Sequence, residues 1–460
     1  MHNRRSGENT STKNDAMLAK GVADFLCTLF RLLDESEIRY CVLHSWELLP
    51  EELISDLDLA VHPSDKAKLP AIFEALRQQG YAPIQWGNYL TGAHSFYFVC
   101  QTTSSLKTAA VDIIFEHRRG GLSLATGEEL VRGRLRHGQF WIPSPETEFA
   151  YLLAKKAWKG VASLSQAQRL KELVQQLGRA NAERIAARIF PVKWKTSVVE
   201  ICANGTANTE LDHLRREFWR MGLARHPFSM IRHLTQECQR GVRRSIHATG
   251  ILVSVLGPDG VGKSTLIESL PDALGSSFRR RRLFHWRPQA FARRKNNDPV
   301  TDPHGQVARG PLISMAYLSA FFIDNWIGYL FVIRPLMIRS GFVQFDRYFH
   351  DVLVDPQRYR YGGPRWFAAM LSRLIPEPDL VILLDADERS IHARKAELPV
   401  PEIKRQRQAY RGLRFKRSRE AFVSTDNGID ATLLASALAV TEFMQQRFNE
   451  RIGAWERLPQ

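Results

Sequence analysis

Hydrophobic and polar positions recur along the chain with different spacings. Gly21 to Leu33 carries apolar side chains at helical spacing, whereas Leu57 to Val61 alternates apolar and polar residues as a half-buried strand does. The runs Ile251 to Leu256 and Pro378 to Asp385 are mostly apolar, which is typical of strands buried in a parallel sheet. Because helices and strands both recur, the pattern predicts an α/β fold class.

At 460 residues the chain is too long for one hydrophobic core, so we expect several domains. In order they are a disordered tail at 1–20, an α/β domain at 21–145, a helical region at 146–245 and a second α/β domain at 246–460. The tail has no apolar core and is not a signal peptide. Further strands of the first domain are expected at 40–43, 96–100 and 109–115.

A complete phosphate-binding loop follows the strand at 251–256. It reads Gly257-Pro258-Asp259-Gly260-Val261-Gly262-Lys263-Ser264-Thr265. Glycines let backbone N–H groups turn toward phosphate oxygens, and the helix that begins here adds positive charge at its N-terminus. Lys263 would reach the β- and γ-phosphates and Ser264 would hold Mg²⁺. The loop predicts binding of ATP with Mg²⁺; the alternative is a glycine-rich turn that only begins a helix.

A second strand, Gly341 to Phe345, ends in Asp346-Arg347-Tyr348. A carboxylate at the carboxyl end of a parallel strand beside the phosphate loop can hold Mg²⁺ or its water molecules. The adjacent Arg347 can bind an acceptor phosphate through its forked guanidinium.

Together these segments resemble thymidylate kinases and related nucleoside-monophosphate kinases. The matching positions are Asp259 in the loop, Trp286-Arg287-Pro288, Asp346-Arg347-Tyr348, Pro378 to Asp385, Arg394, the lid Lys404 to Arg411, and the late turn Ser424 to Asn427. The resemblance implies a parallel sheet flanked by helices and transfer of the ATP γ-phosphoryl group to a small acceptor. It also places Asp259, Arg287 and Arg347 at the acceptor.

Gly260 lies where some members of that family place an arginine inside the loop. Since that cation is missing, the lid would supply it, and Arg405 or Arg407 are the candidates; an exposed basic helix is the alternative. After Tyr348 the sequence departs from thymidylate kinases, because charged residues replace the neutral base-recognition segment. Asp355 and Arg358 suit either a pair at helical spacing or contact with the acceptor. The acceptor is left open as a nucleotide or other small phosphorylated molecule.

The first domain contains an Asp-x-Asp strand. Asp56 and Asp58 point to one side of it, and Asp112 lies in a neighbouring apolar run. Three such carboxylates can hold a pair of Mg²⁺ ions. The arrangement resembles the polymerase-β-like nucleotidyltransferases, in which a small-residue turn precedes the strand. Here Ser45 matches that turn but His44 replaces a glycine, so both nucleotidyl transfer and aspartates without metal stay open.

The net charge of the chain limits the kinds of molecule that it is expected to bind. The net charge of +16 suits phosphorylated substrates, an anionic membrane surface or a solvated basic face, and no nucleic-acid module is visible. The apolar segment Leu312 to Ile333 carries Asp324 and Asn325, which favours a buried helix, with peripheral membrane contact as the alternative. Five scattered cysteines indicate a reducing, cytoplasmic location. A homodimer is plausible.

Three hypotheses about function follow. The first is an ATP-dependent phosphotransferase. The second is a bifunctional nucleotidyltransferase and kinase acting on a sugar or surface-polysaccharide precursor, which only the resemblance suggests. The third is a regulatory P-loop ATPase.

Overall fold

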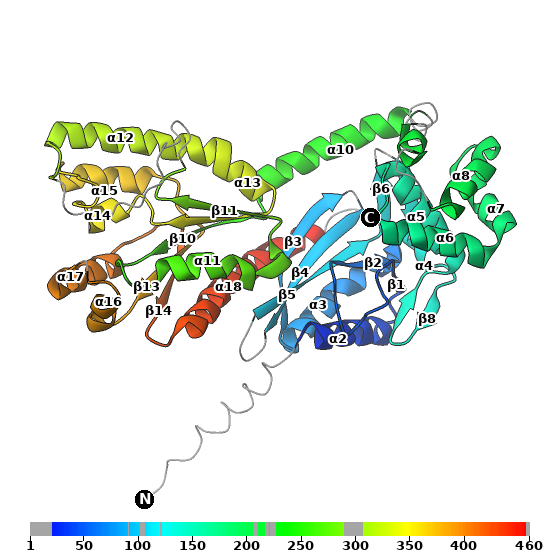
Figure 1. The fold of residues 1–460 in the computed structure, drawn as a ribbon, viewed down its shortest axis with the longest axis horizontal. Helices are drawn as coiled ribbons and strands as arrows, with labels where there is room; N and C mark the ends of the chain where they lie inside the picture. The colour runs from blue at the N-terminus through cyan, green and yellow to red at the C-terminus, as the bar shows by residue number, and fades with distance from the viewer. Residues whose placement is uncertain are drawn as a thin grey trace, which may run out of the picture. The chain divides into compact units, whose positions relative to one another are not determined.

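The computed structural model describes residues 21–90, 92–101, 106–119, 122–205, 210–216, 220, 227–288, 307–396 and 398–456. The tail expected at 1–20 lies outside these residues. The chain divides into two compact units (Figure 1). The first comprises Met1–Gln101, Ala109–Arg243 and Phe448–Gln460, and the second comprises Thr102–Thr108 and Arg244–Arg447.

The C-terminal residues differ from the domain boundary expected from the sequence. Phe448–Gln460 groups with the first unit, although the sequence analysis placed it in the second domain. The reason is burial: Phe448 and Trp455 are part of the first unit's apolar core, and Trp455 is fully buried there. The helical stretch 146–243 likewise groups with the first unit.

The first unit is built on a five-stranded mixed sheet. Its strands, in spatial order, are β1 (Tyr40–Val42), β2 (Leu57–Val61), β5 (Leu106–Ile114), β4 (Ala93–Gln101) and β3 (Tyr81–Leu90). The β2–β5 pair is parallel, and the β1–β2 and β3–β4 pairs are antiparallel. The expected strands are confirmed, and β3 is an additional strand. Two small hairpins add β6 (Glu116–Arg119) with β7 (Leu122–Thr126), and β8 (Leu135–His137) with β9 (Phe140–Ile142).

Helices cover this sheet and continue beyond it. They are α2 (Val22–Glu35), α3 (Leu69–Gln78), α4 (Gly127–Val131), α5 (Pro145–Lys159), α6 (Leu164–Leu177), α7 (Arg179–Ile189) and α8 (Lys195–Ala203), with 3₁₀ turns η1 (Pro63–Lys68) and η2 (Val192–Trp194). Helix α5 begins where the Ser144 hydroxyl accepts the Thr147 N–H and ends at Gly160, whose φ of +71° suits a residue without a Cβ. Helix α10 (Pro227–Ile246) leads to the second unit.

The second unit contains a five-stranded parallel sheet. Its spatial order is β11 (Arg280–His285), β12 (Gly341–Asp346), β10 (Ile251–Leu256), β13 (Leu380–Asp385) and β14 (Arg419–Ser424). Every residue of β10 is buried, as its apolar sequence predicts. After β10 the chain first adds β11 and β12 on one edge of this strand and then adds β13 and β14 on its other edge. The carboxyl ends of β10, β12 and β13 therefore lie at the switch point where α/β sheets bind ligands.

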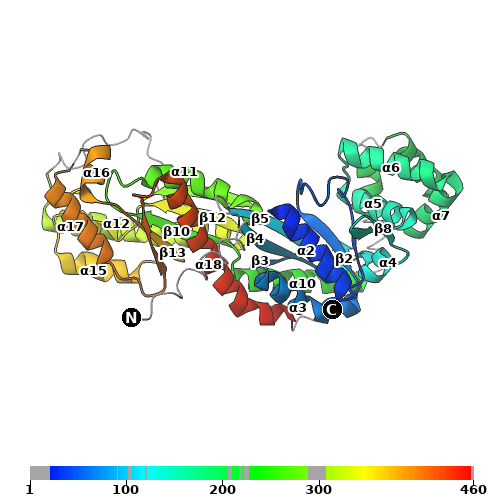
Figure 2. The same cartoon turned by 90° about the horizontal axis from the view of Figure 1, so that it is seen from below.

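Helices flank this sheet on both faces (Figures 1 and 2). They are α11 (Lys263–Ala273), α12 (Pro311–Gly328), α13 (Arg334–Ile338), α14 (Asp351–Val354), α15 (Arg365–Leu374), α16 (Glu388–Arg394), α17 (Val400–Arg411) and α18 (Ile429–Glu456), with a 3₁₀ turn η3 (Gly275–Ser277) and a π-helical turn η4 (Tyr329–Ile333). Leu318 and Phe321 of α12 pack with Phe345 of β12 in one apolar core. These strands and helices hold the phosphate loop in place.

Candidate functional site

The phosphate loop connects β10 to α11 with the backbone that its glycines require. Gly257, Gly260 and Gly262 all have positive φ. A Cβ on Gly257 would lie 2.6 Å from the carbonyl oxygen of Leu384, so no side chain fits there. A Cβ on Gly260 would lie 2.9 Å from Cβ of Lys395. The loop is therefore packed tightly against the end of β13 and against α16, and a bare backbone faces the ligand side.

Lys263 is buried and bends over the loop. Its Nζ donates to the carbonyl oxygens of Gly257 and Pro258, both at 2.8 Å, and lies 3.3 Å from Oδ1 of Asp259. Burial, together with the charge of Arg347, lowers the pKa of Lys263 to about 8. An ammonium held by its own loop in this way is placed to exchange carbonyl oxygens for phosphate oxygens.

Asp259 is the centre of an ion-pair network. Its carboxylate binds the guanidinium groups of both Arg347 and Arg358. Burial alone would raise the pKa of Asp259, but the charges of Lys263, Arg347 and Arg358 lower it far below its usual range. Asp259 is therefore an anion that ties the phosphate loop to the end of β12 and to the segment after α14.

Arg358 is a residue for which the sequence left two roles open, a pair with Asp355 or contact with the acceptor, and its partner Asp259 was not foreseen. The expected side-chain pair between Asp355 and Arg358 is wrong: Asp355 Oδ1 accepts the backbone N–H of Arg358 at 3.2 Å, and the guanidinium reaches Asp259 instead. Arg358 binds Asp259 because that carboxylate is the negative charge at the centre of the cluster that also holds Lys263 and Arg347. The sequence signal was an arginine in the charged segment after Tyr348, but its partner is far away in the chain.

Asp346 ends β12 opposite Val255 of β10, which places it beside the phosphate loop. Its Oδ2 lies 3.2 Å from Nδ1 of His285, while its buried Oδ1 has no hydrogen-bond partner among the described residues. Burial raises the pKa of Asp346, yet His285, Lys263 and Arg347 bring it below its ordinary value. A charged carboxylate with one unused oxygen suits Mg²⁺ or a metal-bound water.

Arg347 follows with φ of +70°, which is unusual for a residue with a side chain. Its N–H donates to the carbonyl oxygen of Val255 at 3.2 Å, and its Nη1 lies 3.5 Å from Oδ2 of Asp351. Asp351 is fully buried and also accepts from the hydroxyl of Tyr359 at 3.4 Å. Burial raises the pKa of Asp351 to about 6. Arg347 thus lies between two carboxylates, those of Asp259 and Asp351.

An aromatic stack adjoins this network. The Trp286 ring lies 3.9 Å from that of Phe321 and 4.3 Å from that of Tyr359, measured between ring centroids. The backbone N–H of Trp286 donates to the carbonyl oxygen of Asp346 at 2.9 Å, so the segment predicted to bind the acceptor reaches the end of β12. Arg287 is half-buried next to residues 289–306, which lie outside the described residues. Its role at the acceptor stays a prediction.

The lid arginines are bound to carboxylates. Arg405 Nε donates to Glu402 at 2.8 Å, and its Nη2 donates to the carbonyl oxygen of Val354 at 2.9 Å. Arg407 Nε donates to Asp385 at 2.6 Å and its guanidinium also pairs with Glu388. The assignment of Arg405 and Arg407 as cations for the transferred phosphoryl group stays a prediction.

Lys395 is a second cation that sequence reasoning did not assign. It is exposed at the end of α16, and its Cβ lies against Gly260 of the phosphate loop. Arg394, by contrast, is held by Thr425, whose Oγ1 accepts at 2.9 Å. Lys395 is therefore a further candidate for the cation that the loop lacks at Gly260, besides Arg405 and Arg407 of the lid.

These residues fit ATP with Mg²⁺. The glycine backbone provides a cradle that a Cβ would fill, Lys263 lies over it, and Asp346 has an unused buried oxygen. Ser264 and Thr265 are exposed in the first turn of α11, where a hydroxyl can reach a metal ion bound to phosphate.

The first unit does not form the predicted three-carboxylate metal site. Asp58 and Asp112 are register partners on β2 and β5, and Asp56 is exposed just before β2. However, the described residues contain no cluster of three or more His, Cys, Asp or Glu side chains with metal-binding geometry. The hypothesis that Asp56, Asp58 and Asp112 bind Mg²⁺ is therefore not supported.

The reason lies in the partners of Asp58. His44 Nε2 lies 2.5 Å from Asp58 Oδ2, and Lys155 Nζ lies 3.2 Å from the same His44 nitrogen and 3.8 Å from the carboxylate. Burial raises the pKa of Asp58, but His44 and Lys155 lower it below its ordinary value. An imidazole and an ammonium thus stand where a metal ion would have to bind.

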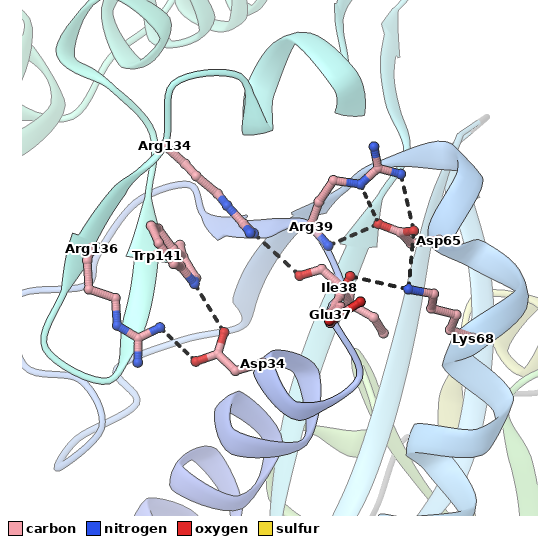
Figure 3. Close-up of a pocket in the computed structure, with 9 residues that line it drawn as sticks. All are labelled: Asp34, Glu37, Ile38, Arg39, Asp65, Lys68, Arg134, Arg136 and Trp141. Atoms are coloured by element: carbon pink, nitrogen blue, oxygen red, sulfur yellow. Dashed lines mark hydrogen bonds and ion pairs between the residues drawn. The ribbon is translucent and has the colours of Figure 1, made fainter.

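A cavity of about 710 Å³ lies elsewhere in the first unit (Figure 3). Its cations are paired within its own wall: Arg39 Nε donates to Asp65 at 2.9 Å, and Arg136 Nη1 donates to Asp34 at 2.7 Å. Trp141 donates to the same Asp34 at 3.1 Å. Neither the phosphate loop nor Asp58 lines this cavity, so it carries none of the chemistry predicted from the sequence.

Comparisons with known proteins add little to this geometry. No family model matches the sequence, and no curated protein matches it. Solved structures similar to the chain include the thymidylate kinase from Ehrlichia chaffeensis, with 15% sequence identity and a TM-score of 0.27, covering 44% of this chain and 98% of that chain. A likeness this weak defines no function, so the conclusions below rest on the residues of this chain.

Proposed function

We propose that the second unit is an ATP-dependent phosphotransferase, similar to thymidylate and nucleoside-monophosphate kinases, that transfers the γ-phosphoryl group to a nucleotide or other small phosphorylated acceptor. One observation carries the proposal. Lys263, Asp346 and Arg347 meet at the carboxyl end of a parallel sheet, around a loop in which Gly257 and Gly260 leave no room for a Cβ.

Each residue has a role in this proposal. The loop N–H groups and Lys263 bind and orient the triphosphate, and Ser264 and Asp346 hold Mg²⁺, which when bound neutralises charge on the β- and γ-phosphates. Arg347 positions the acceptor, and Asp259 holds Arg347 in place. Since phosphoryl transfer asks mainly for positioning and positive charge, no covalent step by the protein is needed.

An acceptor screen tests the proposal. ADP release would be measured with nucleoside monophosphates and sugar phosphates, and we expect a strong dependence on one acceptor class. Lys263→Ala should lower turnover by a factor of about 10² to 10³, the usual cost of removing a preorganised charge-stabilising donor. Arg347→Ala should raise the KM for the acceptor while ATP binding persists.

Other outcomes point to other functions. Slow ATP hydrolysis that no acceptor stimulates would contradict the proposal and indicate a regulatory P-loop ATPase. Pyrophosphate release that survives Lys263→Ala but is lost in Asp58→Ala would indicate nucleotidyl transfer by the first unit. The pairing of Asp58 with His44 and Lys155 argues against that result.

A further inference from the structure

One face of the second unit is apolar and exposed along two neighbouring helices. The residues of α12 and its continuation that expose large apolar side chains are Leu312, Ile313, Tyr317, Ile323, Trp326, Leu330 and Phe331. On α15 they are Trp366, Met370 and Leu374. We call this set the α12–α15 face. The sequence analysis favoured a buried helix here, and this expectation is wrong for the outward half of α12.

The inward half of α12 is anchored to its own unit. Ser314, Leu318, Phe321 and Asp324 recur at helical spacing and are buried. The stretch Pro311–Ile338 is long and apolar enough to cross a membrane by length and composition: an 18-residue window within it has a mean hydropathy of 1.4, but 33% of that window is buried in the protein. Because its inner side packs on the parallel sheet, the helix lies on the surface of a folded unit rather than standing alone as a membrane span.

The two helices form one continuous surface. Trp326 Nε1 donates to the carbonyl oxygen of Leu374 at 3.2 Å, and α12 and α15 lie side by side in both views (Figures 1 and 2). Phe331 is 74% exposed and Trp366 is 64% exposed. Large apolar surfaces of this kind mark binding sites for membranes or proteins.

The two chain segments that carry this surface are rich in arginine and poor in acidic residues. Within residues 307–340 the single acidic residue is Asp324, which is buried, and residues 356–376 contain none. Arg365 and Arg373 are exposed on α15, and the Arg309 guanidinium lies 4.3 Å from the ring of Tyr317. An apolar patch with tryptophans and exposed arginines on its own helices complements an anionic bilayer, where aromatic rings enter the interface and arginines meet lipid phosphates.

We infer that the α12–α15 face docks the protein on an anionic lipid bilayer, with its apolar side chains in the interfacial layer and its arginines on the headgroups. A second copy of the chain fits the face less well, because two such surfaces would bring arginines together without acidic partners. This inference goes beyond the proposed phosphotransferase and does not depend on it, since the phosphate loop takes no part in it.

Vesicle binding by the full chain tests the inference. Flotation would be compared on phosphatidylcholine vesicles with and without phosphatidylserine, and we expect binding mainly to the anionic vesicles. The double variant Phe331→Ser with Trp366→Ser should lower the partition coefficient by about tenfold or more, because two large apolar side chains no longer enter the bilayer. Leu164→Ser, at a 92% exposed apolar position of the first unit, is the matched control and should bind like the wild type.

Arginine variants distinguish the contribution of the charged side chains to vesicle binding from that of the apolar side chains. Arg365→Ala and Arg373→Ala should each weaken binding to anionic vesicles by about fivefold and leave the weak binding to neutral vesicles unchanged. ADP release measured without vesicles should be unaffected in all these variants, which shows that the unit is folded. That readout also separates failure of this inference from failure of the proposed function.

Two results would overturn the inference. One is a chain that does not float with anionic vesicles. The other is a dimer, detected by light scattering, that the Phe331→Ser and Trp366→Ser pair converts to monomers, because a second copy would then cover the face.

Discussion

Each compact unit holds a half-buried aspartate against cationic side chains, and the two arrangements leave different groups available to a ligand. In the second unit Asp259 holds Arg347 and Arg358, while one oxygen of Asp346, beside the glycine loop, has no hydrogen-bond partner in the part of the chain that the structure describes. In the first unit His44 and Lys155 engage Asp58. The comparison teaches that a carboxylate can bind a metal ion only when the neighbouring cations leave one of its oxygens unpaired.

The largest expected effect tests whether the two units are energetically separate. Trp455→Ala removes the largest fully buried side chain, whose ring lies 5.2 Å from that of Phe96 and 5.9 Å from that of Phe73 between centroids. We expect a loss of about 3–5 kcal/mol in the free energy of unfolding of the first unit. Chemical denaturation, followed together with ATP binding, should show the first unit weakened while the second still binds ATP. Equal loss in both units would show that they unfold as one.

The next effect compares the two half-buried aspartates, Asp259 and Asp58, directly. Asp259→Ala leaves the buried guanidinium of Arg347 without its main anion, and we expect a loss of about 3 kcal/mol or more in the stability of the second unit. Asp58→Ala should cost about 1–2 kcal/mol in the first unit. Lys155 can release its proton, since burial already lowers its pKa, whereas an arginine cannot. Urea titrations of the two variants measure the difference, and equal losses would contradict this reasoning.

The sequence predicted the local features of both units. The continuous apolar run at 251–256 is a fully buried strand, and the loop after it has the positive φ angles that its glycines suggest. The Asp-x-Asp strand and its neighbour pair in register, as alternation along strands implied. These features depend on nearby residues, so spacing and residue type were sufficient to find them.

The features that could not be predicted from the sequence depend on contacts between segments that are far apart in the chain. Arg358 reaches Asp259 rather than the adjacent Asp355, and Lys395 packs on Gly260. Lys155 comes from a helix of the separate region predicted at 146–245, yet its ammonium lies 3.8 Å from the carboxylate of Asp58. No periodic pattern encodes which buried carboxylate a distant cation will neutralise, because that choice is made by the packing of the whole unit.

A pH experiment isolates the second aspartate of the phosphate-loop network. Burial raises the pKa of Asp351 to about 6 from an ordinary value of 3.8. Between these values the folded state binds more protons than the unfolded state, so the free energy of unfolding falls as pH rises toward 6 and this effect is complete above it. The loss should total about 2–3 kcal/mol, at about 1.4 kcal/mol for each pKa unit. Asp351→Asn should flatten this part of the stability curve, and parallel curves would show that another group is responsible.

The smallest effect concerns the cation that the glycine loop lacks. Cβ of Lys395, the residue at which α16 ends, lies against Gly260, so this lysine is a further candidate for the missing cation. Lys395→Ala should lower kcat by about tenfold, less than the 10² to 10³ typical of a buried preorganised donor, because the side chain is exposed and solvent screens its charge. Arg389→Ala, which removes an exposed cation of α16, is the matched control and should keep full activity. If Arg405→Ala or Arg407→Ala reduces kcat more than Lys395→Ala does, the lid supplies the cation, and the ion pairs of those arginines with Glu402 and Asp385 must then open during each catalytic cycle.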